Sequence, residues 1–145
     1  MNLFLDTSVL IAASVAEHPR HGRAFAALDQ IRRGEHIGWI SQHTIAEFYA
    51  VLTAAPVSPR IHPSEALRIL EENLLPHFQV IALEPADYTE VVREMASGGW
   101  RSGRVYDALH MRCARKQPID RVYTYNGKDY RACAPDEWKD RIGEP

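Results

Sequence analysis

The chain has 145 residues, of which 46% are hydrophobic and 25% charged, values that are ordinary for a globular domain and exclude disordered or fibrous architectures. No apolar run approaches the roughly 20 residues that span a membrane, and the N-terminus lacks a signal-peptide pattern. We therefore expect a cytoplasmic protein without a membrane partner. The formal net charge of -2 is atypical of a nucleic-acid binder but does not exclude one, because acids gathered around a metal lower the sum. Cys113 and Cys133 lack metal-type spacing and are predicted to be ordinary thiols.

The first residues of the chain carry the first candidate functional group. Residues 3–5 are apolar on both faces, as in a central parallel strand covered by helices, and Asp6-Thr7-Ser8 then supplies a helix N-cap cluster. Asp6 is therefore expected at the carboxyl end of a strand, which is where ligands bind in open α/β sheets. Its alternative role is to cap the following helix, so the choice depends on whether other acids reach the same edge.

A second acid follows the second predicted strand. The elements predicted up to that point are helices over residues 8–16 and about 20–33 and a strand over residues 36–40. Ser41 begins a third helix, and Glu47 stands within its apolar surface. Burial of a carboxylate costs several kcal/mol unless a cation or hydrogen bonds compensate, so Glu47 is either a metal ligand or the ion-pair partner of an arginine. His43 could share the face of Glu47, but a lone helical histidine more often caps the helix or lies at the surface.

The middle of the chain is expected to connect helices and not domains. Residues 54–63 contain three prolines and are predicted to be irregular, and neither flanking part could form a core alone. The pattern then predicts a helix over residues 63–75, a strand over 78–83 and a helix over 84–96. We therefore expect residues 1–145 to form a single domain.

The third acid opens the next helix. Asp107 lies in the first turn of a helix that begins near Arg104, after a glycine-rich turn. An acid at this position can simply interact with the helix dipole, which stabilises the helix by roughly 0.3–1 kcal/mol. Arg101 and Arg104 flank the turn and could pair with phosphate or with Asp107. His110 lies one turn after Asp107 and could be a further ligand, although a magnesium-type site prefers oxygen.

A last strand is predicted over residues 119–125, and it runs into polar residues. Asn126-Gly127 is a strong turn signal, and in such a turn the Asn126 side chain can be occupied with its own backbone. Asp129 follows three residues later. The tail over residues 133–145 is predicted to be irregular, with Trp138 as a packing anchor.

The alternation of strands and helices predicts an α/β fold in three layers: a parallel sheet of four to five strands with helices on both faces. In such a fold Asp6, Glu47, Asp107 and Asp129 can converge on one edge of the sheet. Carboxylates packed so closely raise one another's pKa, so the cluster persists most readily around a hard divalent cation. The chemistry this favours is metal-assisted hydrolysis of phosphodiesters, which needs no nucleophilic side chain.

Four fragments in this order resemble the PIN-domain ribonucleases, and in particular the VapC-type toxins of toxin-antitoxin pairs. These fragments are residues 3–10, 41–47, 106–109 and 124–130. The resemblance implies a PIN-like fold and an acidic triad of Asp6, Glu47 and Asp107 that holds Mg²⁺ or Mn²⁺. It also implies supporting or substrate-contacting roles, which we assign to Thr7, Ser8, Arg104, Thr124 and Asn126.

The sequence departs from the family pattern at two positions. Asn126 stands where the family often has a fourth acid, and we expect Asp129 to take that role instead. Ser8 stands where asparagine is common, a change that affects hydrogen bonding around the metal more than the metal itself.

The resemblance further implies a metal-dependent endoribonuclease that is the toxin of a type II toxin-antitoxin system. Its expected partners are an RNA substrate of the tRNA or rRNA class, single-stranded or structured, a cognate antitoxin whose tail covers the acids, and a second copy in a homodimer. Two alternatives are a non-catalytic binding module with the PIN fold and a metal-dependent phosphatase of the haloacid-dehalogenase type. The phosphatase motif needs a second aspartate two residues after Asp6, where this chain has Ser8. A zinc hydrolase is disfavoured because the histidines show no paired ligand spacing.

Overall fold

A computed structural model describes residues 1–145 and has a five-stranded, fully parallel sheet at its centre. The strand order is β3-β2-β1-β4-β5, so the first strand of the sequence lies in the middle of the sheet. The strands are β1 (Asn2–Leu5), β2 (Ile37–Ser41), β3 (Phe78–Ile81), β4 (Arg121–Tyr123) and β5 (Ile142–Gly143). This confirms the predicted parallel sheet of four to five strands.

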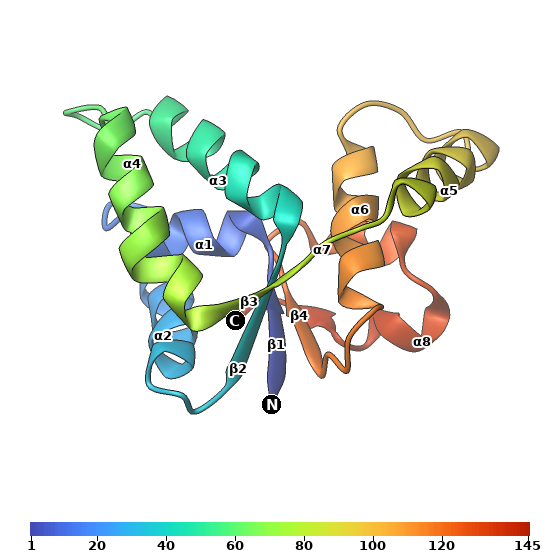
Figure 1. The fold of residues 1–145 in the computed structure, drawn as a ribbon, viewed down its shortest axis with the longest axis horizontal. Coiled ribbons are helices and arrows are strands. Elements are labelled where there is room, and N and C mark those ends of the chain that lie inside the picture. The colour runs from blue at the N-terminus through green and yellow to red at the C-terminus, as the bar shows by residue number, and fades with distance from the viewer.

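Helices cover both faces of the sheet and give three layers (Figure 1). The first group lies on one side and comprises α1 (Thr7–Ser14), α2 (His21–Arg32), α3 (Gln42–Ala54) and α4 (Pro63–Ile69), which continues into the π-helical segment η1 (Leu70–Leu74) and the short 3-10 segment η2 (Leu75–His77). The second group lies on the other side and comprises α5 (Pro85–Ser97), α6 (Arg104–Ala114), α7 (Gly127–Cys133) and α8 (Asp136–Lys139). None of these helices combines the length and apolar character needed to cross a membrane.

Strand β1 is central because both of its faces are buried. Leu3 and Leu5 point into the first and larger core, which they form with residues of α1 to α4. Phe4, between them, points to the other face and belongs to the second core, with residues of α6, α7 and β5. Each fully buried side chain of this size contributes roughly 1.5–3 kcal/mol to stability. Parallel pairing of β1 with β2 and with β4 then brings the carboxyl ends of these three strands to the same edge of the sheet.

The C-terminal part of the chain is more ordered than predicted. The expected irregular tail contains the short helix α8 and the edge strand β5, which pairs with β4 through Val122 and Ile142. Trp138 packs against the second core, as predicted. The turn predicted at Asn126-Gly127 is the start of α7, with Asn126 as the residue that precedes the helix.

The remaining differences are small. The helix predicted over residues 63–75 is α-helical only to Ile69. A π-helical segment follows, and its residues Leu70 and Leu74 are both buried in the first core.

Both cysteines are free thiols. Burial raises the pKa of Cys113 to about 12, so this thiol stays protonated and packs as a small apolar group.

Candidate metal centre

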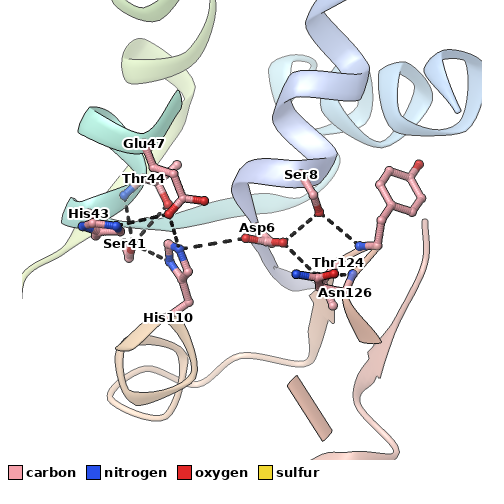
Figure 2. A network of polar contacts seen from close by, with 10 residues as sticks. Asp6, Ser8, Ser41, His43, Thr44, Glu47, His110, Thr124 and Asn126 are labelled. Atoms are coloured by element: carbon pink, nitrogen blue, oxygen red, sulfur yellow. Dashed lines mark hydrogen bonds and ion pairs between the residues drawn. The ribbon is translucent and has the colours of Figure 1, made fainter. Parts of the chain in front are cut away.

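Asp6 follows the last residue of β1 and is held by two hydroxyl groups. Ser8 Oγ and Thr124 Oγ1 donate to Asp6 Oδ2 at 2.7 and 2.8 Å, and only 4% of Asp6 is exposed (Figure 2). Its side chain accepts no hydrogen bond from the backbone N–H groups of the first turn of α1, so the alternative role as a side-chain cap is wrong. The second carboxylate oxygen, Oδ1, lies on the side of α6, 4.0 Å from His110 Nε2.

The same hydroxyl groups join the ends of β1 and β4. Ser8 Oγ accepts from the Tyr125 backbone N–H at 3.1 Å, and Thr124 Oγ1 accepts from the Asn126 backbone N–H at 2.9 Å. Each hydroxyl therefore donates to Asp6 while it accepts from the backbone after β4. This arrangement fixes the orientation of the Asp6 carboxylate relative to two neighbouring strands.

Glu47 lies on α3 and is paired with histidines, and no arginine forms an ion pair with it. His43 Nε2 and His110 Nε2 each lie 3.2 Å from Glu47 Oε2. Burial raises the pKa of Glu47, but the hydrogen bond and charge of His110, with the charge of His43, outweigh it and leave the pKa below its usual value. Glu47 is thus held as a carboxylate that faces the end of β1.

His110 is the residue that sequence reasoning undervalued. It is 1% exposed, its Nδ1 lies 2.7 Å from Ser41 Oγ, and its Nε2 reaches Glu47 (Figure 2). An ionised carboxylate only accepts, so Nε2 must carry the proton that it donates to Glu47. His110 is therefore placed to orient Glu47. The sequence feature that pointed to a role for His110 is its position one helical turn after Asp107.

Asp107 lies in the first turn of α6 and has no ion-pair partner within the chain. Burial raises its pKa most, followed by the negative charge of Asp6, with smaller effects of Asp129 and Glu47, while His110 acts in the opposite direction. The resulting pKa is about 7, compared with an ordinary value of 3.8. A residue that served only the helix dipole would be stabilised in its charged form. Repulsion between acids and burial dominate here instead.

Asp129 forms an ion pair, whereas the side chain of Asn126 makes no capping hydrogen bond. Asp129 Oδ1 pairs with Arg104 at 3.3 Å, so Arg104 contacts this acid and not Asp107. The Asn126 side chain makes no capping hydrogen bond, and the expectation that it binds its own backbone is wrong. Asn126 lies beside Thr124 at the Asp6 end of the network (Figure 2).

Two adjoining cavities open onto these residues. The first has a volume of about 290 Å³, and its lining includes Asp6, Thr7, Ser8, Glu47, Asp107 and Asn126. The second has a volume of about 450 Å³ and shares Glu47, Asp107 and Asn126 with the first. Asp129 and Arg104 line only the second cavity. The three acids of the predicted triad therefore meet in one cavity, whereas the fourth acid lies next to it.

The donor atoms at this edge fit a hard divalent cation. Ligand atoms of Asp6, Glu47 and His110 lie within 4.8 Å of one another, and Asp107 lines the same cavity. The buried hydroxyls of Thr7 and Tyr130 lie close to Glu47 and Asp6, and neither makes a hydrogen bond of good geometry within the protein. Carboxylate oxygens are the ligands that such cations prefer, and a cation would also relieve the repulsion that raises the pKa of Asp107.

The chain is similar in sequence to two ribonucleases of the VapC type. Ribonuclease VapC40 of Mycobacterium tuberculosis H37Rv is 33% identical over 104 residues, which cover 72% of each chain. Ribonuclease VapC27 of the same strain is 36% identical over 108 residues, or 74% of this chain and 72% of that protein.

Solved structures share the fold at lower sequence identity. Mycobacterium tuberculosis VapC20, described as a toxin that cleaves the sarcin-ricin loop, has a TM-score of 0.68 at 20% identity, covering 90% of this chain and 94% of its own. VapBC2 from Rickettsia felis, bound to a promoter DNA fragment, has a TM-score of 0.60 at 16% identity, covering 99% and 98%. The PIN domain family matches residues 3–134. The chain therefore belongs to the PIN domain family.

Proposed function

We propose that this protein is a metal-dependent endoribonuclease that hydrolyses RNA phosphodiester bonds and acts as the toxin of a type II toxin-antitoxin system. The observation that carries the proposal is the meeting of Asp6, Glu47 and Asp107 in one cavity at the carboxyl edge of the sheet. The names of the two relatives above 30% identity, both ribonucleases of the VapC type, support the same activity.

In this proposal Asp6, Glu47 and Asp107 hold the cation, which is Mg²⁺ or Mn²⁺ because the set is rich in carboxylate oxygens. The bound ion would supply a lowered pKa for the attacking water and stabilisation of negative charge on the phosphoryl oxygens. Ser8 and Thr124 keep Asp6 oriented, and His110 does the same for Glu47. No serine, cysteine or histidine is needed as a nucleophile.

The residues beside the triad complete the proposed site. Thr7 offers a buried hydroxyl that makes no hydrogen bond of good geometry within the protein, and Asn126 offers an uncharged side chain that lines both cavities. Arg104 supplies a cation for a substrate phosphate. Asp129 remains our fourth acid, since its charge reaches Asp107 and its carboxylate holds Arg104 in place.

The proposed partners follow from the same activity. They are an RNA of the tRNA or rRNA class, a cognate antitoxin that covers the acids, and a second copy of the chain in a homodimer. Two of the similar solved structures, FitAB bound to DNA and VapBC2 of Rickettsia felis bound to promoter DNA, support the antitoxin partner. Action on cellular RNA fits the cytoplasmic location predicted from the sequence, and we propose that residues 1–145 act as one domain.

The experiment that tests the proposal measures RNA cleavage by purified protein after exhaustive chelation and after adding back each metal. We expect cleavage only with Mg²⁺ or Mn²⁺, and none by an Asp6→Asn preparation purified in parallel, which controls for contaminating ribonuclease. Full activity after chelation would contradict metal dependence. Stabilisation by Mg²⁺ without cleavage of any tested RNA would favour the non-catalytic binding module.

A further inference from the structure

The lining of the second cavity includes Arg101 and Tyr106, which have no role in the proposed hydrolysis. Its lining joins the acids Glu47 and Asp107 to an arginine-rich segment that includes Arg101 and Arg104, and to the aromatic side chain of Tyr106. Its volume of about 450 Å³ exceeds that of the cavity around Asp6. Acids that hold a cation would therefore lie at the boundary between two spaces, and the larger of these is lined with cationic and aromatic groups.

Tyr106 presents an exposed ring that is held in a fixed plane. It is 49% exposed although it directly precedes Asp107, and its ring is parallel to that of His43, with centroids 5.0 Å apart and an interplanar angle of 4°. His43 is in turn anchored to Glu47 at 3.2 Å. The Tyr106 ring is thus linked to the acidic site through His43.

Arg104 is held from two sides. Its guanidinium lies 4.4 Å from the centre of the Trp100 ring, within cation–π distance, and 3.3 Å from Asp129 Oδ1. Its side chain nevertheless remains 35% exposed. A guanidinium oriented in this way at the wall of an open cavity is suited to a phosphate group, which it binds with geometric specificity.

We propose that this cavity binds one unpaired nucleotide of the RNA strand, next to the bond that is cut, with its base on Tyr106 and its phosphate at Arg104. The inference rests on the proposed function and deepens it, because it assigns Tyr106 and Arg104 to the base and the phosphate of one nucleotide. A base within a duplex is already stacked on both faces, whereas an unpaired base is free to stack on an aromatic side chain. Such stacking tolerates different bases, since every base has a π face.

The test measures binding separately from cleavage. A labelled, unstructured 12-nucleotide RNA is titrated with protein in chelator at low salt, and fluorescence anisotropy gives its Kd, alongside the same RNA annealed to its complement. We expect Tyr106→Ala to weaken binding of the single strand roughly 5- to 100-fold and to leave duplex binding unchanged. Tyr106→Phe, which keeps the ring, should bind as the wild type does.

Phe25 provides a matched control. It is also an exposed aromatic residue beside a histidine, 42% exposed with its ring centroid 5.4 Å from that of His21, but it lies on α2 and lines neither cavity. Phe25→Ala should bind the single strand as the wild type does. Single-strand binding by Tyr106→Ala equal to that of the wild type, or an equal loss for strand and duplex, would overturn the inference.

A second comparison separates stacking from an indirect effect through His43 and Glu47. The RNA is replaced by an abasic strand with the same sugar-phosphate backbone. The wild type should prefer the RNA with bases, and Tyr106→Ala should lose most of this preference. An indirect effect would instead weaken both strands equally, and that result would also overturn the inference.

The outcomes distinguish this inference from the proposed function. Loss of base-dependent binding in Tyr106→Ala, in a protein that cuts no RNA under any metal condition, would support the nucleotide site while the ribonuclease proposal fails. Cleavage by the wild type, with Tyr106→Ala equal to it in binding and in kcat/KM, would support the ribonuclease while the nucleotide site fails.

Discussion

Asp6 and Asp107 are the same residue type at the same edge of the sheet, yet their surroundings differ. Asp6 is almost fully buried and receives two hydroxyl donors that are themselves tied to the backbone after β4. Asp107 is partly exposed, has no ion-pair partner, and has its pKa raised to about 7 by burial and by the charge of Asp6. On the Asp6 side of the site the carboxylate is held in one orientation. On the Asp107 side the carboxylate needs a nearby cation to stay fully ionised near pH 7.

This difference extends to the surroundings of each acid. On the Asp6 side, one hydroxyl group from the first turn of α1 and one from the end of β4 hold the carboxylate and leave it little freedom. The Asp107 side opens toward arginines and exposed aromatic rings, which are suited to a substrate. Under the proposed function, the Asp6 side would position the metal and the Asp107 side would contact the substrate. The following predictions test that separation, from the largest expected effect to the smallest.

Removal of charge from either side should abolish cleavage. Asp6→Asn, Glu47→Gln and Asp107→Asn each remove a ligand of the proposed cation, which supplies several kcal/mol of transition-state stabilisation, so rates should fall about 10³-fold or more. Cleavage rates at equal protein and Mg²⁺ concentrations measure this, with circular dichroism to verify folding. Expression of each variant should also relieve growth arrest.

The control is Asp29→Asn, which removes the carboxylate of an α2 residue from its surface ion pair with Arg33, the residue after that helix. It should cut RNA as the wild type does. Wild-type turnover in any one of the three triad variants would remove that residue from the site and, with it, that side of the comparison.

Asp129 and Asn126 test which residue completes the Asp107 side. If Asp129 is the fourth acid, Asp129→Asn should raise the Mg²⁺ concentration for half-maximal activity by roughly 10- to 100-fold, the usual loss for a residue that orients metal ligands. Asn126→Ala should have a much smaller effect. A Mg²⁺ titration in which Asn126→Ala is the more damaged variant would move the fourth position to this neutral residue.

Loss of one hydroxyl donor should loosen the Asp6 anchor. Thr124→Val keeps the shape but removes the 2.8 Å bond to Asp6 and the acceptor for the Asn126 N–H. Hydrogen bonds to charged groups contribute roughly 1.5–3 kcal/mol, so the free energy of unfolding in urea should fall by about that amount. Thr53→Val, which affects only an exposed hydroxyl on α3, should change it little. Equal stability of Thr124→Val and wild type would show that the anchor is not energetically important.

Without metal, Asp107→Asn should stabilise the protein, because it removes a partly buried charge and its repulsion from Asp6. Relief of about 1 kcal/mol would raise the Tm by roughly 3–6 °C in chelator, and saturating Mg²⁺ should narrow or reverse the difference. A lower Tm of the variant in chelator would favour a helix-dipole role for Asp107.

The pH dependence of the same comparison has a defined sign. The pKa of Asp107 is raised in the folded state, so its contribution to stability is full below about pH 4 and is lost as the pH rises through about 7. In chelator, the Tm advantage of Asp107→Asn should therefore be larger at pH 8 than at pH 5. An advantage that does not change with pH would mean that Asp107 carries no shifted proton.

The sequence by itself determined the alternation of strands and helices and the central place of residues 3–5, because hydrophobic periodicity is a local property of the chain. It also pointed to Asp6 and Glu47, since a carboxylate at the end of an apolar strand or within an apolar helix surface is costly to bury and can be recognised from the sequence pattern. It missed β5, a strand of only two residues whose existence depends on pairing with β4.

Only the tertiary structure decided how the polar side chains pair. His110 meets Glu47 across 63 residues of sequence, and Arg104 pairs with Asp129 instead of Asp107. Likewise, Tyr106 lies flat against His43 from another helix. Such contacts depend on strand order and on the rotation of each helix against the sheet. These are set by packing of the whole core, and no local pattern encodes them.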